Sequence, residues 1–165
     1  MSEIGRLVIE DARKRLLKAY PEQLRAALAA LGEEQLWWRP NQASNSVGNL
    51  LLHVCGSTRH FLGRGVGGSD YLRDRPAEFA ERGPRPRAEL LRLLETTVAE
   101  AERVLSGLDP ARLLEVSDRA GEPQTVLTLL LRTVHHWSAH VGQIVFVAKS
   151  LREGVFDELW MKTMR

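Results

Sequence analysis

Apolar residues recur every three or four positions along most of this chain, and this spacing constrains the fold more than any other feature. The clearest example runs from about Arg87 to Leu108. Its apolar stripe consists of Leu91, Leu94, Val98, Ala101, Leu105 and Leu108. An α-helix places residues with this spacing on one face. No segment alternates apolar and polar residues with the period of two that a half-buried strand shows. The sequence therefore predicts an all-α protein.

Three further segments share this helical periodicity, and proline and glycine separate them. They run from about Ser2 to Leu31, from about Ser46 to Leu62 and from about Pro123 to Ser150. Pro21 predicts a kink or break in the first segment, and Pro123 suits the first turn of the last helix. Four amphipathic helices of roughly 20 residues, each about 30 Å long, predict a four-helix bundle.

The length of 165 residues fits a single domain. We expect its core to span about residues 2–151, with a C-terminal tail at 152–165. The segment from Arg64 to Arg87 is rich in glycine, proline and charge. We interpret it as a long loop that crosses the length of the bundle between the second and third helices.

Composition and charge argue against several classes of protein and partner. The net charge is +2, and arginine is interleaved with acidic residues, so no basic patch indicates nucleic acid. The N-terminus lacks the apolar region of a signal peptide, and Arg132 interrupts the most apolar run, so we expect no membrane span. Cys55 is the single cysteine, which excludes an internal disulfide. We interpret it as a buried structural thiol. These features favour a cytoplasmic protein.

The stretch VHHWSAHVGQ, residues 134–143, contains three of the five histidines. A helix turns about 100° per residue, so His136 and His140 lie about 40° apart and about 6 Å apart along the axis. The apolar stripe of this segment is centred close to His140, so both side chains are expected to face the interior. His135 is expected on the solvent side.

An i, i+4 histidine pair is a common way to bind a transition metal. A third ligand is expected from another helix, and His53, in the middle of the second helix, is the best candidate. His60 lies about 10 Å further along that helix, too far to share a metal with His53. Three histidine ligands leave one coordination position open, as in catalytic zinc sites. The alternative is that these are ordinary hydrogen-bonded core histidines.

The residues around the histidines narrow the chemistry. No carboxylate lies between His136 and His140, which argues against zinc peptidase chemistry, and no Glu-x-x-His motif supports a di-iron centre. A metal lowers the pKa of a bound thiol without help from a base, so thiol transfer fits better than hydrolysis, unless the loop supplies a base. Asn49 and Gln143 are candidates to support the ligands, or else a helix cap and a helix bridge. Gly142 predicts close helix approach.

Two segments, NSVGNLLLHVCG and HHWSAHVGQI, resemble the DinB-like superfamily of bacterial four-helix bundles, as does the connector LGEEQLWWRPNQASN. The resemblance covers about Leu16 to Leu151. It implies an up-down-down-up topology, metal binding by His53, His136 and His140, and a homodimer. Many relatives carry an arginine before the Gly-Gln pair, where this chain has Val141, so any role of that arginine is in doubt here.

The resemblance also implies an activity, since characterised members are metal-dependent S-transferases or isomerases that use low-molecular-weight thiols. The sequence therefore favours an enzyme that acts on a small molecule, with Zn²⁺ or Ni²⁺ as cofactor and catalytic residues unassigned. The alternative is a non-catalytic, stress-related binding or dimerisation bundle whose metal site is structural or vestigial.

Overall fold

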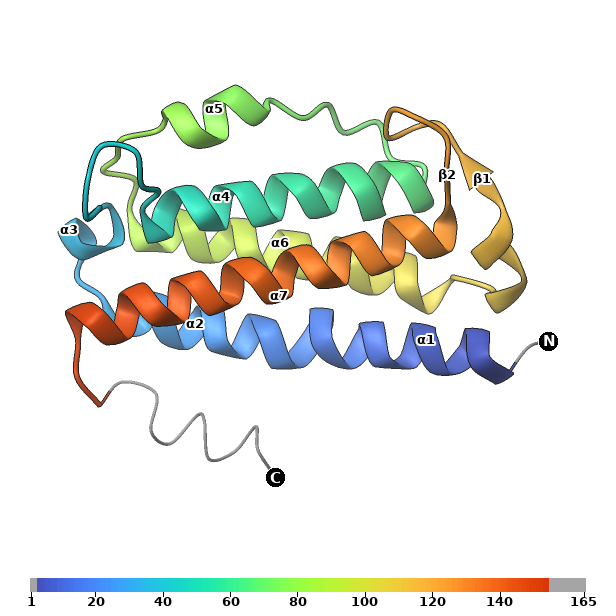
Figure 1. Ribbon diagram of the computed structural model, residues 1–165, viewed down its shortest axis with the longest axis horizontal. Coiled ribbons are helices and arrows are strands. Elements are labelled where there is room, and N and C mark those ends of the chain that lie inside the picture. The colour runs from blue at the N-terminus through green and yellow to red at the C-terminus, as the bar shows by residue number, and fades with distance from the viewer. Residues whose placement is uncertain (1–2, 155–165) are drawn as a thin grey trace.

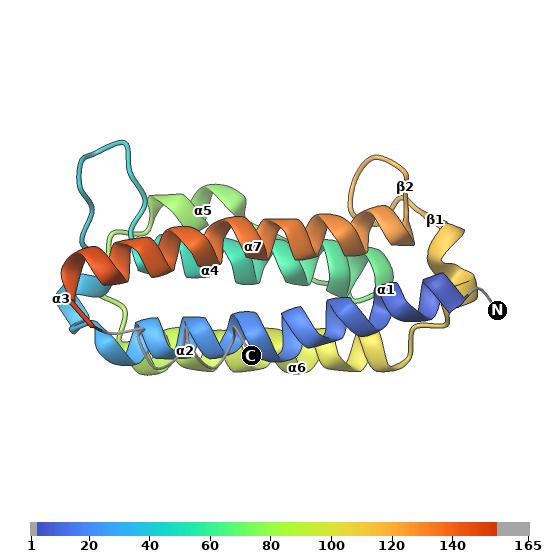
Figure 2. The ribbon, with the colours of Figure 1, turned by 60° about the horizontal axis from the view of Figure 1, so that its bottom comes forward.

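The computed structural model describes residues 3–154, which form four long helical rods packed side by side (Figures 1 and 2). The first rod contains α1 (Glu3–Arg13), a π-helical stretch (Lys14–Ala19) and α2 (Tyr20–Ala30). The second contains α4 (Val47–Thr58), which continues as a π-helical stretch (Arg59–Val66). The third is α6 (Arg87–Ser106), and the fourth is α7 (Val126–Leu151).

The rods follow the predicted up-down-down-up order. In Figure 1 the first rod runs from right to left, α4 and α6 both run from left to right, and α7 returns from right to left. Because α4 and α6 are parallel, the chain between them must travel back along the bundle, as the crossover interpretation requires. The all-α bundle and the long crossover are therefore both confirmed.

The crossover is not the continuous loop that we expected. The second rod extends to Val66, four residues beyond the predicted end, and a short helix, α5 (Arg75–Ala80), lies within the connection. Asp74 caps this helix by accepting a hydrogen bond from the backbone N–H of Ala77, and Pro76 occupies its first turn, where a missing N–H costs nothing. In Figure 1, α5 lies against α4.

The other connections contain short elements. They are α3 (Glu33–Leu36), a 3₁₀ turn (Pro110–Leu114), and the antiparallel pair β1 (Val116–Ser117) and β2 (Gln124–Thr125). Two of our predictions are wrong here. No strand was expected, and Pro123 does not lie in the last helix, because Gln124 and Thr125 first pair as β2. Thr125 then caps α7 by accepting a hydrogen bond from the N–H of Thr128.

Pro21 disturbs the first rod as predicted, without breaking it. The six residues before Tyr20 adopt a π-helical geometry, and α2 then begins with Pro21 in its first turn. Proline lacks the N–H of a regular helical hydrogen bond and its ring crowds the preceding turn. A wider π-helical turn absorbs this mismatch while the helix continues.

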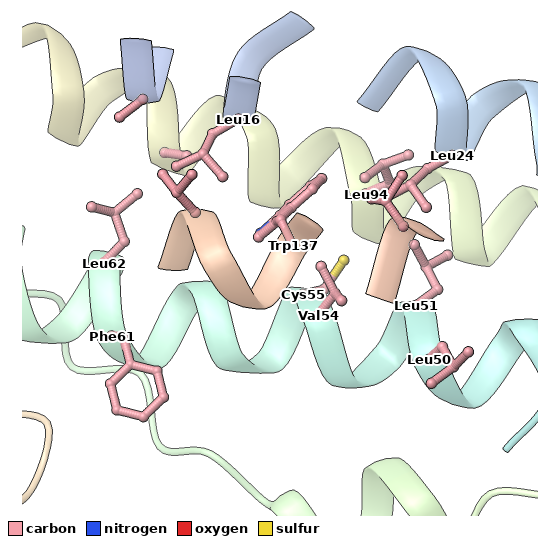
Figure 3. Close-up of a cluster of buried hydrophobic side chains, with 14 of the residues drawn as sticks. Leu16, Leu24, Leu50, Leu51, Val54, Cys55, Phe61, Leu62, Leu94 and Trp137 are labelled. Atoms are coloured by element: carbon pink, nitrogen blue, oxygen red, sulfur yellow. The ribbon is translucent and has the colours of Figure 1, made fainter. Parts of the chain in front are cut away.

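The core lies between the four rods and is centred on Trp137 of α7. Figure 3 shows its ring among Leu16 and Leu24 of the first rod, Val54 and Cys55 of α4, and Leu94 of α6. Trp137 is 1% exposed and stacks on Tyr20, with ring centroids 6.4 Å apart. Its indole N–H donates a hydrogen bond to Oγ1 of Thr58 at 2.6 Å.

Two remaining expectations concern a membrane span and the C-terminal tail. No helix within residues 3–154 is both long and apolar enough to cross a bilayer. Most of the C-terminal tail, from residue 155 onward, lies outside the described residues.

Candidate metal centre

Three histidines from two rods converge between α4 and α7. Nε2 of His136 lies 2.9 Å from Nε2 of His53 and 3.1 Å from Nε2 of His140. One ring nitrogen from each histidine lies within 4.8 Å of the others. His53 is buried, and His136 and His140 are half-buried. The structure thus brings together the three residues that the sequence singled out, and they could hold a metal ion.

The positions of these histidines follow from helix geometry. His136 and His140 lie one turn apart on α7, on the side that faces α4, and His135 is exposed as predicted. His53 is the seventh residue of α4, whose start Ser46 sets by capping the N–H of Asn49 at 3.1 Å. The centre lies near the middle of both helices.

A short helix of the crossover supports His53 from behind. Oε2 of Glu78, on α5, accepts a hydrogen bond from Nδ1 of His53 at 2.8 Å. Arg73 holds the same carboxylate through two hydrogen bonds, from Nε at 2.7 Å and from NH2 at 2.8 Å. Its NH2 also lies 3.0 Å from Nδ1 of His53. Sequence reasoning missed Glu78 and Arg73, although it named this loop as a possible source of a general base.

Two residues of α4 allow α5 to dock over the histidine. A Cβ at Gly56 would collide with Oε1 of Glu78, so only glycine leaves room for this carboxylate. Asn49 donates from Nδ2 to the backbone carbonyls of Glu78 at 3.0 Å and Glu81 at 2.9 Å. Asn49 therefore combines the predicted capping role, as part of the Ser46 capping box, with holding α5 in place.

Gln143 supports His140 in the same way. Its Oε1 accepts a hydrogen bond from Nδ1 of His140 at 2.7 Å, as expected for a residue one turn further on the same face. The Gln143 oxygen and the Glu78 carboxylate can only accept, and their contacts favour the tautomer of His140 and His53 in which Nδ1 carries the proton. The Nε2 atoms of both rings are then unprotonated and point toward His136.

The electrostatic setting favours the neutral forms of His136 and His140. Burial lowers the pKa of His136 to about 3, and the nearby charges of His140, His53, Arg73 and Arg132 act in the same direction. Burial also lowers the pKa of His140, although its bond to Gln143 opposes this. For Glu78, burial raises the pKa, but hydrogen bonds from Arg73 and His53 outweigh it and hold the pKa below its usual value. Neutral imidazole is the form that binds metal ions.

The donor set fits a divalent transition metal. Zinc-to-nitrogen bonds of about 2.0–2.1 Å in tetrahedral geometry place ligand atoms roughly 3.3 Å apart, close to the 2.9 and 3.1 Å that separate Nε2 of His136 from Nε2 of His53 and of His140. Without an ion, His136 Nε2 has at most one proton to offer to two facing lone pairs. A bound cation satisfies all three nitrogens at once. Carboxylate and amide partners behind the ligands are also typical of metal sites. Nδ1 of His136 is the exception, since it has no hydrogen-bond partner among the described residues.

A cavity of about 470 Å³ lies beside the cluster. His53 and His136 form part of its wall, together with Phe61 and the arginines Arg73, Arg75 and Arg132. Two of the proposed ligands therefore face a space large enough for a small molecule.

The remaining candidates have structural roles. Burial raises the pKa of the fully buried Cys55 to about 12, as fits the buried structural thiol that was predicted. His60 contacts a loop through Nε2 and the carbonyl of Ala120 at 3.2 Å. Gly142 does not permit close helix approach, because it is exposed and a Cβ there would have no neighbour within 4 Å; that prediction is wrong. Val141, at the position where many relatives carry an arginine, is buried in the core.

The two tryptophans before α4 lie apart from the histidines. Trp37 packs against Gly48 and Gly83 and donates from Nε1 to the carbonyl of Arg85 at 3.3 Å. Trp38 is 42% exposed. Trp37 is therefore largely a packing residue, whereas Trp38 is not in the core.

Comparison with known proteins shows that the chain and its fold are DinB-like. The family model described as "Protein of unknown function (DUF1572)" matches residues 3–163. The crystal structure of YjoA, a DinB-like protein of Bacillus subtilis, matches with a TM-score of 0.65 and 19% identity, covering 87% of this chain and 94% of that one. A DinB-like protein of Bacillus cereus matches with a TM-score of 0.58 and 18% identity, covering 80% and 85%. No curated protein matches the chain.

These matches confirm the resemblance that was inferred from the sequence motifs. At these identities the two crystal structures support the fold, and the chemistry must be argued from the residues of this chain.

Proposed function

The chain belongs to the family of proteins of unknown function DUF1572, a DinB-like family, and on this premise we propose that it is a metal-dependent thiol S-transferase. The observation that carries the proposal is the convergence of the Nε2 atoms of His53, His136 and His140 at 2.9 and 3.1 Å beside a cavity. The substrates are a small thiol and an electrophile, and the metal is Zn²⁺ or Ni²⁺.

The donor set supports a catalytic rather than a structural ion. Structural zinc sites close all four positions with protein ligands, whereas catalytic sites leave one for water or substrate. No fourth histidine, cysteine or carboxylate joins this cluster within residues 3–154. The adjoining cavity is the natural place for the reacting molecule.

The chemistry divides between the ion and the chain. A bound divalent ion supplies Lewis acidity, which lowers the pKa of a thiol and makes its sulfur a nucleophile at neutral pH. In the transfer, the S–H proton passes to solvent, the sulfur bonds to an electrophilic carbon, and the leaving group departs with its electron pair. Glu78 and Gln143 hold the imidazoles of His53 and His140 in the required tautomer and orientation.

The state of Glu78 favours thiol transfer over hydrolysis. Hydrolysis commonly needs a general base, and Glu78 is the carboxylate that contacts the histidine cluster. Both its oxygens are occupied, Oε1 by Arg73 and Oε2 by Arg73 and His53, and its pKa lies below the usual value. Such a carboxylate is a weak base, and Glu78 is not among the residues that line the cavity. Glu78 is therefore a positioning residue.

Removing the charge of Glu78 tests this positioning role. Glu78→Gln is expected to weaken Zn²⁺ binding by about 10- to 100-fold, the usual effect of losing the carboxylate behind a histidine ligand. Zinc affinity measured by competition with a chromophoric chelator gives the value. Glu100→Gln is the matched control, because Glu100 is equally buried and also bonds an arginine, Arg59 at 3.0 Å, but contacts no histidine. Equal affinity in the two variants would contradict the role.

The activity itself is tested with a fluorogenic electrophile. Protein loaded with Zn²⁺ or Ni²⁺ is incubated with monochlorobimane and each of several low-molecular-weight thiols. We expect at least one thiol to react faster than in the metal-free control, because metal coordination activates the sulfur. The measurement is the rate of fluorescence increase after subtraction of the spontaneous reaction.

The controls separate catalysis from simple metal binding. His135→Ala changes a solvent-side histidine next to a ligand and should retain the rate, whereas His136→Ala should lose it. If metal binds but no thiol reacts above background, the S-transferase proposal fails and a non-catalytic metal-binding bundle becomes the better description.

A further inference from the structure

The cavity beside the histidines is strongly cationic. Arg73, Arg75 and Arg132 line it, and no aspartate or glutamate is among its described lining residues. Glu78 neutralises Arg73 through a paired hydrogen bond. Arg75 and Arg132 form no ion pair with any residue in the described part of the chain. The wall therefore carries two uncompensated positive charges, before the charge of any metal is added.

Aromatic rings hold these two guanidinium groups in place. The guanidinium carbon of Arg132 lies 4.0 Å from the ring centroid of Phe61, and that of Arg75 lies 5.2 Å from the centroid of Phe79. Figure 3 shows Phe61 projecting from the second rod on the side opposite Leu62. A guanidinium group that lies over the face of an aromatic ring still has its N–H groups free, because they point outward in the plane of the guanidinium.

Both arginines are tied to the histidine cluster by their elements. Arg132 lies one helical turn before His136 on the same face of α7, about 6 Å along the axis. Phe79, beneath Arg75, packs on His53 with ring centroids 4.5 Å apart. The positive charge of the arginines also affects His60. Burial lowers the pKa of His60, and its hydrogen bond to Ala120 opposes this. The charges of Arg73, Arg64 and Arg132 lower the pKa further.

We propose that this cavity binds a carboxylate of the substrate between Arg75 and Arg132, next to the three histidines. Arginine presents N–H pairs that match the two oxygens of a carboxylate, and such charge-assisted hydrogen bonds are among the strongest that side chains form. That the bound molecule is a substrate rests on the proposed function. The carboxylate site itself does not, because Arg75 and Arg132 line the cavity whether or not a metal is bound. The site selects a small molecule by its charge as well as by its thiol.

Two thiol probes of the same chain length, one anionic and one neutral, test this site. 3-Mercaptopropionate carries a carboxylate where 3-mercapto-1-propanol carries a neutral alcohol. Each is titrated into the metal-free, isotope-labelled protein, and the dissociation constant is measured from NMR chemical shifts. The carboxylate is expected to bind roughly tenfold or more tightly than the alcohol, with the largest shifts at residues around the cavity.

Three single variants complete the test. Arg75→Gln and Arg132→Gln should each reduce the preference for 3-mercaptopropionate, and Arg6→Gln, which removes the same charge from an exposed position on α1, should leave it intact. Equal binding of both probes by the unmodified protein, or a preference that survives both cavity variants, overturns the carboxylate site. A preference that depends on the arginines in a protein without thiol transfer supports the site and rejects only the enzymatic role.

Discussion

Replacing His136 with alanine is expected to abolish stoichiometric metal binding. Nε2 of His136 lies within 3.1 Å of the Nε2 atoms of both His53 and His140. Its loss leaves only two histidine ligands for the metal. The affinity for Zn²⁺ should fall by roughly 100-fold or more, since even the loss of a ligand's hydrogen-bond partner costs about 10- to 100-fold. Metal content after dialysis, together with chelator competition, measures the effect.

His135→Ala is the matched control for this prediction, because it removes an exposed imidazole one residue away. It should retain the metal content of the unmodified protein. The melting temperature of metal-free His136→Ala distinguishes two roles for the site. A bundle that folds without the ion should melt close to the unmodified metal-free protein, whereas metal that is needed for folding would leave both samples unstable. Full metal occupancy in His136→Ala would refute the three-histidine site.

Replacing Trp137 with alanine is expected to produce the largest loss of stability of any single core substitution discussed here. The side chain is 1% exposed and lies at the centre of the bundle. Truncation removes its packing against the other rods and leaves a cavity, which typically costs about 3–5 kcal/mol of unfolding free energy. Urea unfolding, followed by circular dichroism, measures this change.

Two further variants separate the contributions of Trp137. Trp137→Phe keeps most of the ring but removes the N–H that donates to Thr58 at 2.6 Å, so it should cost less than Trp137→Ala. Trp38→Ala removes a tryptophan that is 42% exposed and should change stability by less than about 1 kcal/mol. A similar loss in Trp38→Ala and Trp137→Ala would contradict the proposed arrangement of the core.

The histidine cluster could be predicted because its geometry depends mainly on helical periodicity. The separation of His135 from His136 follows from a rotation of about 100° per residue along one helix. The third member, His53, was identified from its apolar neighbours, and the resemblance to the DinB-like superfamily supported the same choice. Gln143 was likewise placed correctly near His140, because the two residues are three positions apart on one face.

The partners on the crossover were beyond this reasoning. The short helix α5 has a signal in the sequence, because Asp74 is a favourable helix cap and Pro76 a favourable first-turn residue ahead of Glu78. That Glu78 meets His53, 25 residues earlier, depends on where the crossover docks. Asn49 and Gly56 decide that docking through a hydrogen bond and an absent side chain, and neither effect has a periodic signature in the chain.

The sequence by itself determined the four amphipathic helices, the crossover between the second and third, and the inward faces of His53, His136 and His140. These properties depend on residue spacing within one helix, which the backbone repeat converts directly into direction. Only the tertiary structure decided that Glu78 and Arg73 stand behind His53, and that Arg75 and Arg132 flank a cavity beside it. Those contacts join segments without a common repeat, so packing and chain path set them rather than local geometry.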